Sequence, residues 1–104
     1  MKTNIEFKAT GVTLGARQHY LAYLRKQPDV HIKLYREPDK PRAIQILAET
    51  SKVRLAVGYV PQDVAASLAS LMDNHTFINV DKFRITGGSH QKGLYYGMSL
   101  QASY

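Results

Sequence analysis

Two tyrosines and three polar side chains have the types and the spacing of a nucleic-acid contact. Tyr59 and Tyr95 fall at the ends of expected strands, where their aromatic faces can stack on bases. Lys40 and Arg42 share one turn and can neutralise phosphates, and Gln62 lies in the first turn of a helix whose N–H groups attract anions. We therefore expect these five residues to contact a nucleic acid.

A plainer interpretation of the same residues places the tyrosines half-buried at the rim of the fold, with their hydroxyls in water. Tyr59 favours the functional interpretation because it stands between the basic turn and the helix start. Asp63 argues slightly against it, since a carboxylate there would repel a phosphate. The glycine-rich residues 88–93 are interpreted as a hairpin loop, with the alternative of a flap in which Lys92 contacts phosphate.

The sequence gives no support to catalysis or to a metal centre. The chain has no cysteine, which excludes thiolate zinc sites and cysteine nucleophiles. Its four histidines form no H-x-x-x-H or H-E-x-x-H pattern, and its carboxylates show no metal-ligand spacing. Leu94 follows Gly93 where a Walker motif needs Lys and then Ser or Thr. No nucleophile-elbow pattern is present. We expect no catalytic residue, no metal and no other cofactor.

The formal charge of +6 is concentrated in one part of the chain. Residues 1–60 hold eleven Lys and Arg against five Asp and Glu, whereas residues 61–104 hold three of each kind. This asymmetry fits a polyanionic partner as well as it fits a solvated basic surface. The start of the chain does not read as a signal peptide, and no apolar run has the length of a membrane span, so we expect a cytoplasmic protein without membrane contact.

Hydrophobic periodicity predicts strands and helices in the order β-α-β-β-β-α-β-β. Alternating apolar residues predict strands, and apolar residues at helical spacing predict the two helices. The expected strands are residues 5–9, continuing toward 14, and 30–35, 43–48, 53–59, 77–86 and 95–102. The expected helices are residues 16–26 and a second that opens at Pro61 and buries Val64, Ala65, Leu68, Leu71 and Met72.

The element order predicts a single domain over residues 1–104 of the β-rich α+β class. Strands outnumber helices and are joined mostly by short turns, so the strict alternation of a parallel α/β sheet is excluded. We expect a small, mostly antiparallel barrel, OB-like or SH3-like, with two helices packed against it.

Several short motifs, in order and at their spacing, resemble the HIRAN domain over residues 9–102. These motifs are Arg36-Glu37-Pro38-Asp39-x-Pro41, Ala43-Ile44-x-Ile46, Gly58-Tyr59-Val60-Pro61, and then Ala65 and Leu68. Gly11-Val12, followed by Arg17-Gln18, resembles the opening of the standalone bacterial members. The resemblance implies an OB-like barrel that is not itself catalytic. In eukaryotic DNA-repair helicases such a module binds single-stranded DNA and captures its 3′ end.

This sequence departs from the family at positions that contact DNA. The family's loop usually continues Asn-Pro-Tyr-Asp-x-Asn-Ala-Ile, whereas Lys40-Pro41-Arg42 here runs directly into Ala43. The family has an Arg-Tyr pair where this chain has Thr13-Leu14, and a His where this chain has Tyr59. A Lys of the family corresponds to Gln62, and an aromatic residue of the family corresponds to Tyr95. The fold therefore transfers more safely than the ligand.

We expect a non-catalytic module that binds nucleic acid, with single-stranded DNA, including its 3′ end, as the leading ligand. Tyr59 and Tyr95 would stack on bases, and Lys40 and Arg42 would contact phosphates. Gln62 would hydrogen-bond the nucleic-acid backbone or the terminal hydroxyl. RNA is not separated from DNA by these features. The alternative is a protein-interaction module on the same barrel that has lost DNA binding, which the shortened loop favours.

Overall fold

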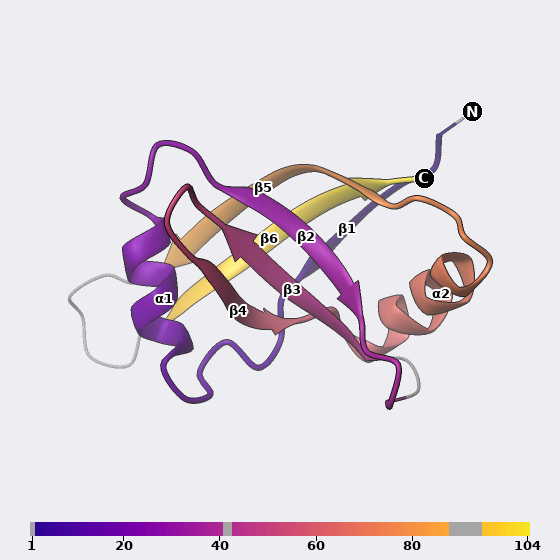
Figure 1. The fold of residues 1–104 in the computed structure, drawn as a ribbon, viewed down its shortest axis with the longest axis horizontal. Helices are drawn as coiled ribbons and strands as arrows, with labels where there is room; N and C mark the ends of the chain where they lie inside the picture. The colour runs from indigo at the N-terminus through magenta and orange to yellow at the C-terminus, as the bar shows by residue number, and fades with distance from the viewer. Residues whose placement is uncertain (1, 41–42, 88–94) are drawn as a thin grey trace.

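The computed structural model describes residues 2–40, 43–87 and 95–104. In these ranges the chain forms six strands and two helices in the predicted order (Figure 1). The elements are β1 (Asn4–Lys8), α1 (Arg17–Leu24), β2 (His31–Arg36), β3 (Ile44–Glu49), β4 (Arg54–Tyr59), α2 (Gln62–Asp73), β5 (Asn79–Gly87) and β6 (Tyr96–Ser103).

The strands form two antiparallel sheets of three strands each, ordered β1-β6-β5 and β2-β3-β4. An isolated bridge between Thr10 and Tyr59 links them. The β-rich α+β class is confirmed, but within the described ranges neither sheet closes into the expected OB-like or SH3-like barrel, because no ladder joins the edges of β2 and β5. Alternation in a sequence specifies which face of a strand is buried and leaves the pairing of its edges open.

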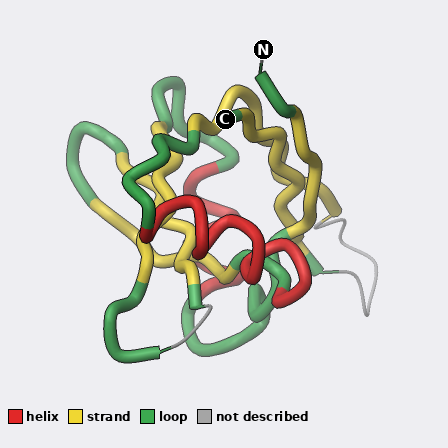
Figure 2. Tube along the Cα trace, turned by 90° about the vertical axis from the view of Figure 1, so that its right-hand side faces the viewer, coloured by secondary structure: helices red, strands yellow, loops and turns green. Residues whose placement is uncertain are grey.

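The core lies between the two sheets, and each sheet turns its apolar face inward. The view along the long axis shows the strands curving around this core, with α2 crossing one end (Figure 2). Each large apolar side chain that is fully buried stabilises the fold by about 1.5–3 kcal/mol relative to the same side chain exposed to water. The largest fully buried side chains are Leu21, Leu24, Ile44, Ile46, Val57, Leu68, Met98 and Leu100.

The helix α2 begins one residue later than expected and buries a narrower face. Pro61 is its N-cap residue, and the carbonyl of Pro61 accepts the N–H of Ala65 at 2.7 Å. Ala65, Leu68 and Ala69 are fully buried, whereas the expected Val64, Leu71 and Met72 are only partly buried. The helix covers the end of the sheets, so one stripe meets the core and its flanks stay accessible. Neither described helix is long and apolar enough to cross a membrane.

Two predicted strands are shorter at one end. The strand β1 ends at Lys8, and Gly11 adopts a φ of +69° that turns the chain away, so the expected continuation to Leu14 does not form. The strand β5 starts at Asn79, which leaves Phe77 before it with 79% of its surface exposed. In both places the alternation of apolar residues in the sequence continues past the end of the strand into a loop, so the predicted strand was too long.

Candidate nucleic-acid interface

Tyr59 is fixed at the end of β4 by two backbone hydrogen bonds to Thr10. The N–H of each residue donates to the carbonyl of the other, at 2.8 and 2.9 Å. Gly58 permits this approach, because a Cβ at that position would lie 2.8 Å from the carbonyl oxygen of Thr10. The glycine of the Gly-Tyr-Val-Pro motif therefore sets where the Tyr59 side chain leaves the sheet.

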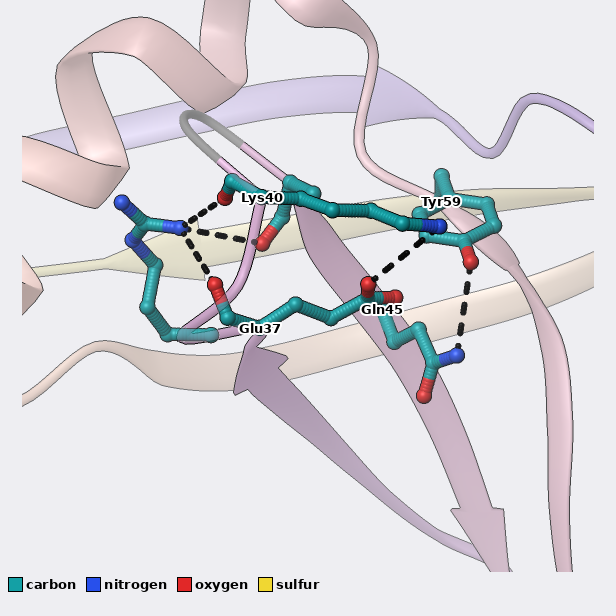
Figure 3. Close-up of polar contacts among 6 residues, drawn as sticks. Glu37, Lys40, Gln45 and Tyr59 are labelled. Carbon is teal, nitrogen blue, oxygen red and sulfur yellow. Dashed lines mark hydrogen bonds and ion pairs between the residues drawn. The ribbon is translucent and has the colours of Figure 1, made fainter.

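The half-buried ring of Tyr59 is oriented by two side chains. The guanidinium carbon of Arg17 lies 5.2 Å from the ring centroid, and Nη1 of Arg17 donates to the carbonyl of Gly11 at 2.7 Å. Nε2 of Gln45 donates to the Tyr59 hydroxyl at 3.4 Å (Figure 3). A base that stacks on Tyr59 must therefore use the face opposite Arg17 or displace the guanidinium.

Tyr59 belongs to a row of side chains on the outer face of sheet β2-β3-β4. Tyr35 pairs with Gln45 across β2 and β3, and Gln45 pairs with Tyr59 across β3 and β4. Paired residues project to the same face, so the two tyrosines stand two strand spacings apart, about 10 Å. Tyr35 is 48% exposed. The sheet thus presents two aromatic side chains with an amide between them.

The turn after β2 is held from within by Arg36. Nη1 of Arg36 donates to the carbonyl oxygens of Glu37 at 2.9 Å and Lys40 at 2.8 Å, and Nε lies 3.4 Å from a carboxylate oxygen of Asp73 on α2 (Figure 3 draws the turn contacts). The N–H groups of Arg36 therefore stabilise the fold. Arg36, one of the three basic residues of this turn, thus contacts groups of the protein itself.

Lys40 extends from the turn toward the Tyr59 side chain, and its ammonium is paired with Glu37 (Figure 3). Nζ of Lys40 lies 3.7 Å from Oε2 of Glu37, whose side chain is only 14% exposed while that of Lys40 is 67% exposed. The lysine can reach a solvent-side phosphate, but the partly buried carboxylate beneath it offsets its charge. An anion here meets a cation that already has a partner.

The other predicted site residues that the structure describes, Gln62 and Tyr95, come from the start of α2 and from the residue before β6. Gln62 is the exposed first residue of α2, three positions after Tyr59. Tyr95 is 64% exposed and directly precedes β6, whose start lies beside α1, whereas the turn with Lys40 lies toward α2 (Figure 1). The structure therefore gathers Lys40, Tyr59 and Gln62 around one corner and sets Tyr95 on its α1 side. Arg42 and Lys92 lie outside the described residues.

Three residues of this interface were not predicted from the sequence as site residues. Arg17 was predicted only as part of the first helix and of the motif that follows Gly11-Val12. Gln45 is the one polar residue between two buried isoleucines, a pattern that marks an outward position. Thr10 carries no signal beyond its place after a strand. Within the described residues no three His, Asp or Glu side chains gather as metal ligands.

The model of the HIRAN domain family matches residues 5–103. The chain belongs to the HIRAN family. The match includes the corner around Tyr59 and all three strands of sheet β1-β6-β5, and it confirms the resemblance seen in the motifs. No curated protein and no solved structure matches the chain. The HIRAN domain is in general a DNA-binding module.

Proposed function

We propose that this HIRAN domain is a non-catalytic module that binds single-stranded DNA and recognises its 3′ end. The observation that carries the proposal is the ring of Tyr59, held by Arg17 and Gln45 at the corner where a lysine and a helix N-terminus meet. Stacking on an aromatic ring is worth about 1–3 kcal/mol per base, and a ring that is already oriented loses less entropy on binding.

Around this ring the remaining groups have separate roles. Lys40 contacts the phosphate beside the stacked base, and Gln62 with the first N–H groups of α2 hydrogen-bonds the backbone or the terminal hydroxyl. Arg17 lies against one face of the ring and supplies a second cation at the corner. Asp63 and Glu37 place negative charge close by, which limits how many phosphates the corner accepts.

Tyr95 supplies a second stacking face on the α1 side of Tyr59. An extended strand that runs from Lys40 past Tyr59 toward Tyr95 meets one cation and two aromatic side chains. This route fits a ligand with a repeating backbone better than a compact metabolite. Single-stranded nucleic acid has such a backbone, and every one of its bases offers a stacking face.

The test is a binding titration of labelled single strands that differ only at the 3′ end. We expect tighter binding to a free 3′ hydroxyl than to a 3′-phosphorylated end, and RNA of the same sequence is titrated in parallel to compare the two nucleic acids. If about three phosphates are neutralised, log K falls against log salt with a slope of about −2. No binding to any single strand at low salt overturns the proposal, and equal affinity for blocked ends overturns its end-recognition part.

A protein-interaction module is the second candidate, and a groove between the edges of β2 and β5 supports it. The groove has a volume of about 760 Å³, and the 79% exposed Phe77 lies at its wall. Ile32 and Leu34 from β2 face Ile78 and Val80 across it. Capture of one stoichiometric protein that persists after nuclease treatment, together with no binding to single strands, favours this candidate over DNA binding.

A further inference from the structure

A shallow trough of about 640 Å³ lies on sheet β1-β6-β5, and its lining includes no residue of the Tyr59 corner. Each strand lines it with three consecutive residues, centred on Phe7 in β1, Leu100 in β6 and Phe83 in β5. These central side chains point into the core, so their neighbours in sequence point outward. The trough therefore lies on the outer face of this sheet. Figure 1 shows the sheet behind strands β2, β3 and β4.

Three cations surround the trough. Lys8 and Arg84 flank Ser99 in one cross-strand row, and Lys82 pairs with Gln101 in the next row. All three cationic residues are exposed. Strands lie about 4.8 Å apart, so Lys8 and Arg84 begin about 10 Å from one another and can converge on an anion above Ser99.

The charges of this trough are largely uncompensated. Among the described residues none of the three cations has a carboxylate within 4 Å, in contrast to Lys40 with Glu37. The acidic residue of the trough is Glu6, and its Oε1 accepts a hydrogen bond from Nε2 of Gln101 at 2.6 Å. The trough therefore carries a net charge of +2 and offers three cationic groups to an anion.

The small residue Ser99 lines the trough on its middle strand, β6. Ser99 lies between the two cationic side chains, and Gly97 is the next outward residue toward the start of the strand. Gly97 lies outside the residues that line the trough, and a Cβ on it would lie 3.1 Å from Oγ1 of Thr86. Long cationic walls above a small hydroxyl-bearing floor suit a phosphodiester backbone, whose oxygens accept from both.

The Lys8 side of the trough lies close to the Tyr59 corner along the backbone. Lys8 precedes Thr10 by two residues, and the bridge pairs Thr10 with Tyr59. Residues two apart in an extended chain, and residues paired across a bridge, project to the same side of the chain. From Tyr59 the path to Lys8 is one strand spacing across and two residues along, about 5 Å and about 7 Å.

We propose that this trough binds the phosphates of the nucleic-acid strand that leaves the Tyr59 corner. The inference rests on the proposed function and extends it. The corner holds the stacked end of the strand, and Lys8, Arg84 and Lys82 hold the following phosphates across sheet β1-β6-β5. Affinity therefore increases with strand length, and a large part of the salt dependence comes from the trough.

The test compares the double variant K8Q/R84Q with the unmodified chain, using strands of about 4 and about 20 nucleotides that share the same 3′ end. We expect at least about a tenfold loss for the long strand at low salt and a salt slope smaller by about 1.4. The short strand keeps its affinity within about twofold. The conservative variant K8R/R84K keeps long-strand binding, and equal melting temperatures show that the variants are folded.

The matched control is K26Q/K52Q, which removes the same charge from exposed positions outside the trough and the corner. We expect this control to lose much less affinity for the long strand. Equal losses in K8Q/R84Q and K26Q/K52Q, or an unchanged long-strand affinity in K8Q/R84Q, overturn the inference. Failure of the proposed function is a different result, in which the unmodified chain does not bind the short strand.

Discussion

The corner around Tyr59 and the trough on sheet β1-β6-β5 use their cations differently. At the corner, Arg36 bonds to turn carbonyls, Lys40 pairs with Glu37, and Arg17 lies over the Tyr59 ring. In the trough, Lys8 and Arg84 have no carboxylate within ion-pair distance among the described residues. The cations at the corner contact groups of the protein itself, whereas the cations of the trough remain available to a ligand.

The comparison changes the meaning of the charge asymmetry in the sequence. Residues 1–60 carry the whole net charge, yet several of their cations are engaged by the protein itself. Residues 61–104 are neutral as a segment but contribute Lys82 and Arg84 to the basic trough. The distribution of charge along the sequence therefore shows which segment carries the excess of basic residues, but it does not show which surface of the fold presents basic side chains.

The largest effect is expected from Gly58→Ala, which breaks the junction between the two regions. The added Cβ meets the Thr10 carbonyl at 2.8 Å, and neither backbone can yield without breaking the bridge. We expect a loss of about 2 kcal/mol in stability and a fall of about 10 °C in the melting temperature.

Thermal unfolding followed by circular dichroism measures this loss, with Gly97→Ala as the control. At Gly97 the new Cβ lies 3.1 Å from Oγ1 of Thr86, a side chain that can rotate away, so its effect is smaller. Equal melting temperatures for Gly58→Ala and the unmodified chain would show that the close approach at Thr10 is not needed.

Tyr59→Ala tests the corner alone. Removing the ring eliminates stacking, and we expect at least about a tenfold loss of affinity for short single strands in a titration. Tyr59→Phe keeps the ring and loses only the hydroxyl bonded to Gln45, so it retains most of the affinity. If Tyr59→Ala and Tyr59→Phe bind equally well, the ring is not the stacking platform.

Glu37→Gln sharpens the contrast in charge. The change removes the carboxylate that pairs with Lys40 and keeps its shape, so we expect about a threefold tighter binding of short strands at low salt. Asp29→Asn removes a charge from an exposed position between α1 and β2 and serves as the control. Identical gains in the two variants would mean that only net charge matters.

The smallest effect is expected at Glu49, whose carboxylate forms ion pairs with Lys33 and Arg54, two further cations of residues 1–60. Desolvation raises its pKa, but hydrogen bonds and charges from Lys33 and Arg54 outweigh it and hold the pKa below 4.5. A lowered carboxyl pKa adds stability above pH 4.5 that is lost as the pH falls through the folded-state pKa. We expect Glu49→Gln to melt with a weaker pH dependence below pH 5, measured as melting temperature against pH. A profile parallel to that of the unmodified chain argues against the pairing.

The order of elements was predictable because alternation and helical spacing are local properties. The proline and glycine positions predicted the β4–α2 corner, where Tyr59 and Gln62 are close in the sequence. Barrel closure was not predictable, since it depends on whether the edges of β2 and β5 pair. The structure does not confirm the closed barrel, nor the expected continuation of β1 toward Leu14 and the expected start of β5 at Phe77.

The trough was beyond sequence reasoning because its members meet only through strand register. Lys8, Ser99 and Arg84 come from three strands and share a row once β6 lies between β1 and β5. Arg17 was visible in the sequence as part of a helix and of the Arg17-Gln18 motif, neither of which indicates a contact with an aromatic ring. Local patterns predicted the corner, and only the paired sheet brought the trough together.

The side chain of Gln18 fixes α1 to the start of β6 through hydrogen bonds of the kind that a neighbouring strand would form. Its Oε1 accepts the N–H of Tyr96 at 2.8 Å, and its Nε2 donates to the carbonyls of Tyr96 and Val12, each at 2.9 Å. A side-chain amide here takes the place of a neighbouring peptide group. In hydrogen exchange, the amide proton of Tyr96 should therefore be released only when α1 detaches, so that one proton reports the docking of a whole helix.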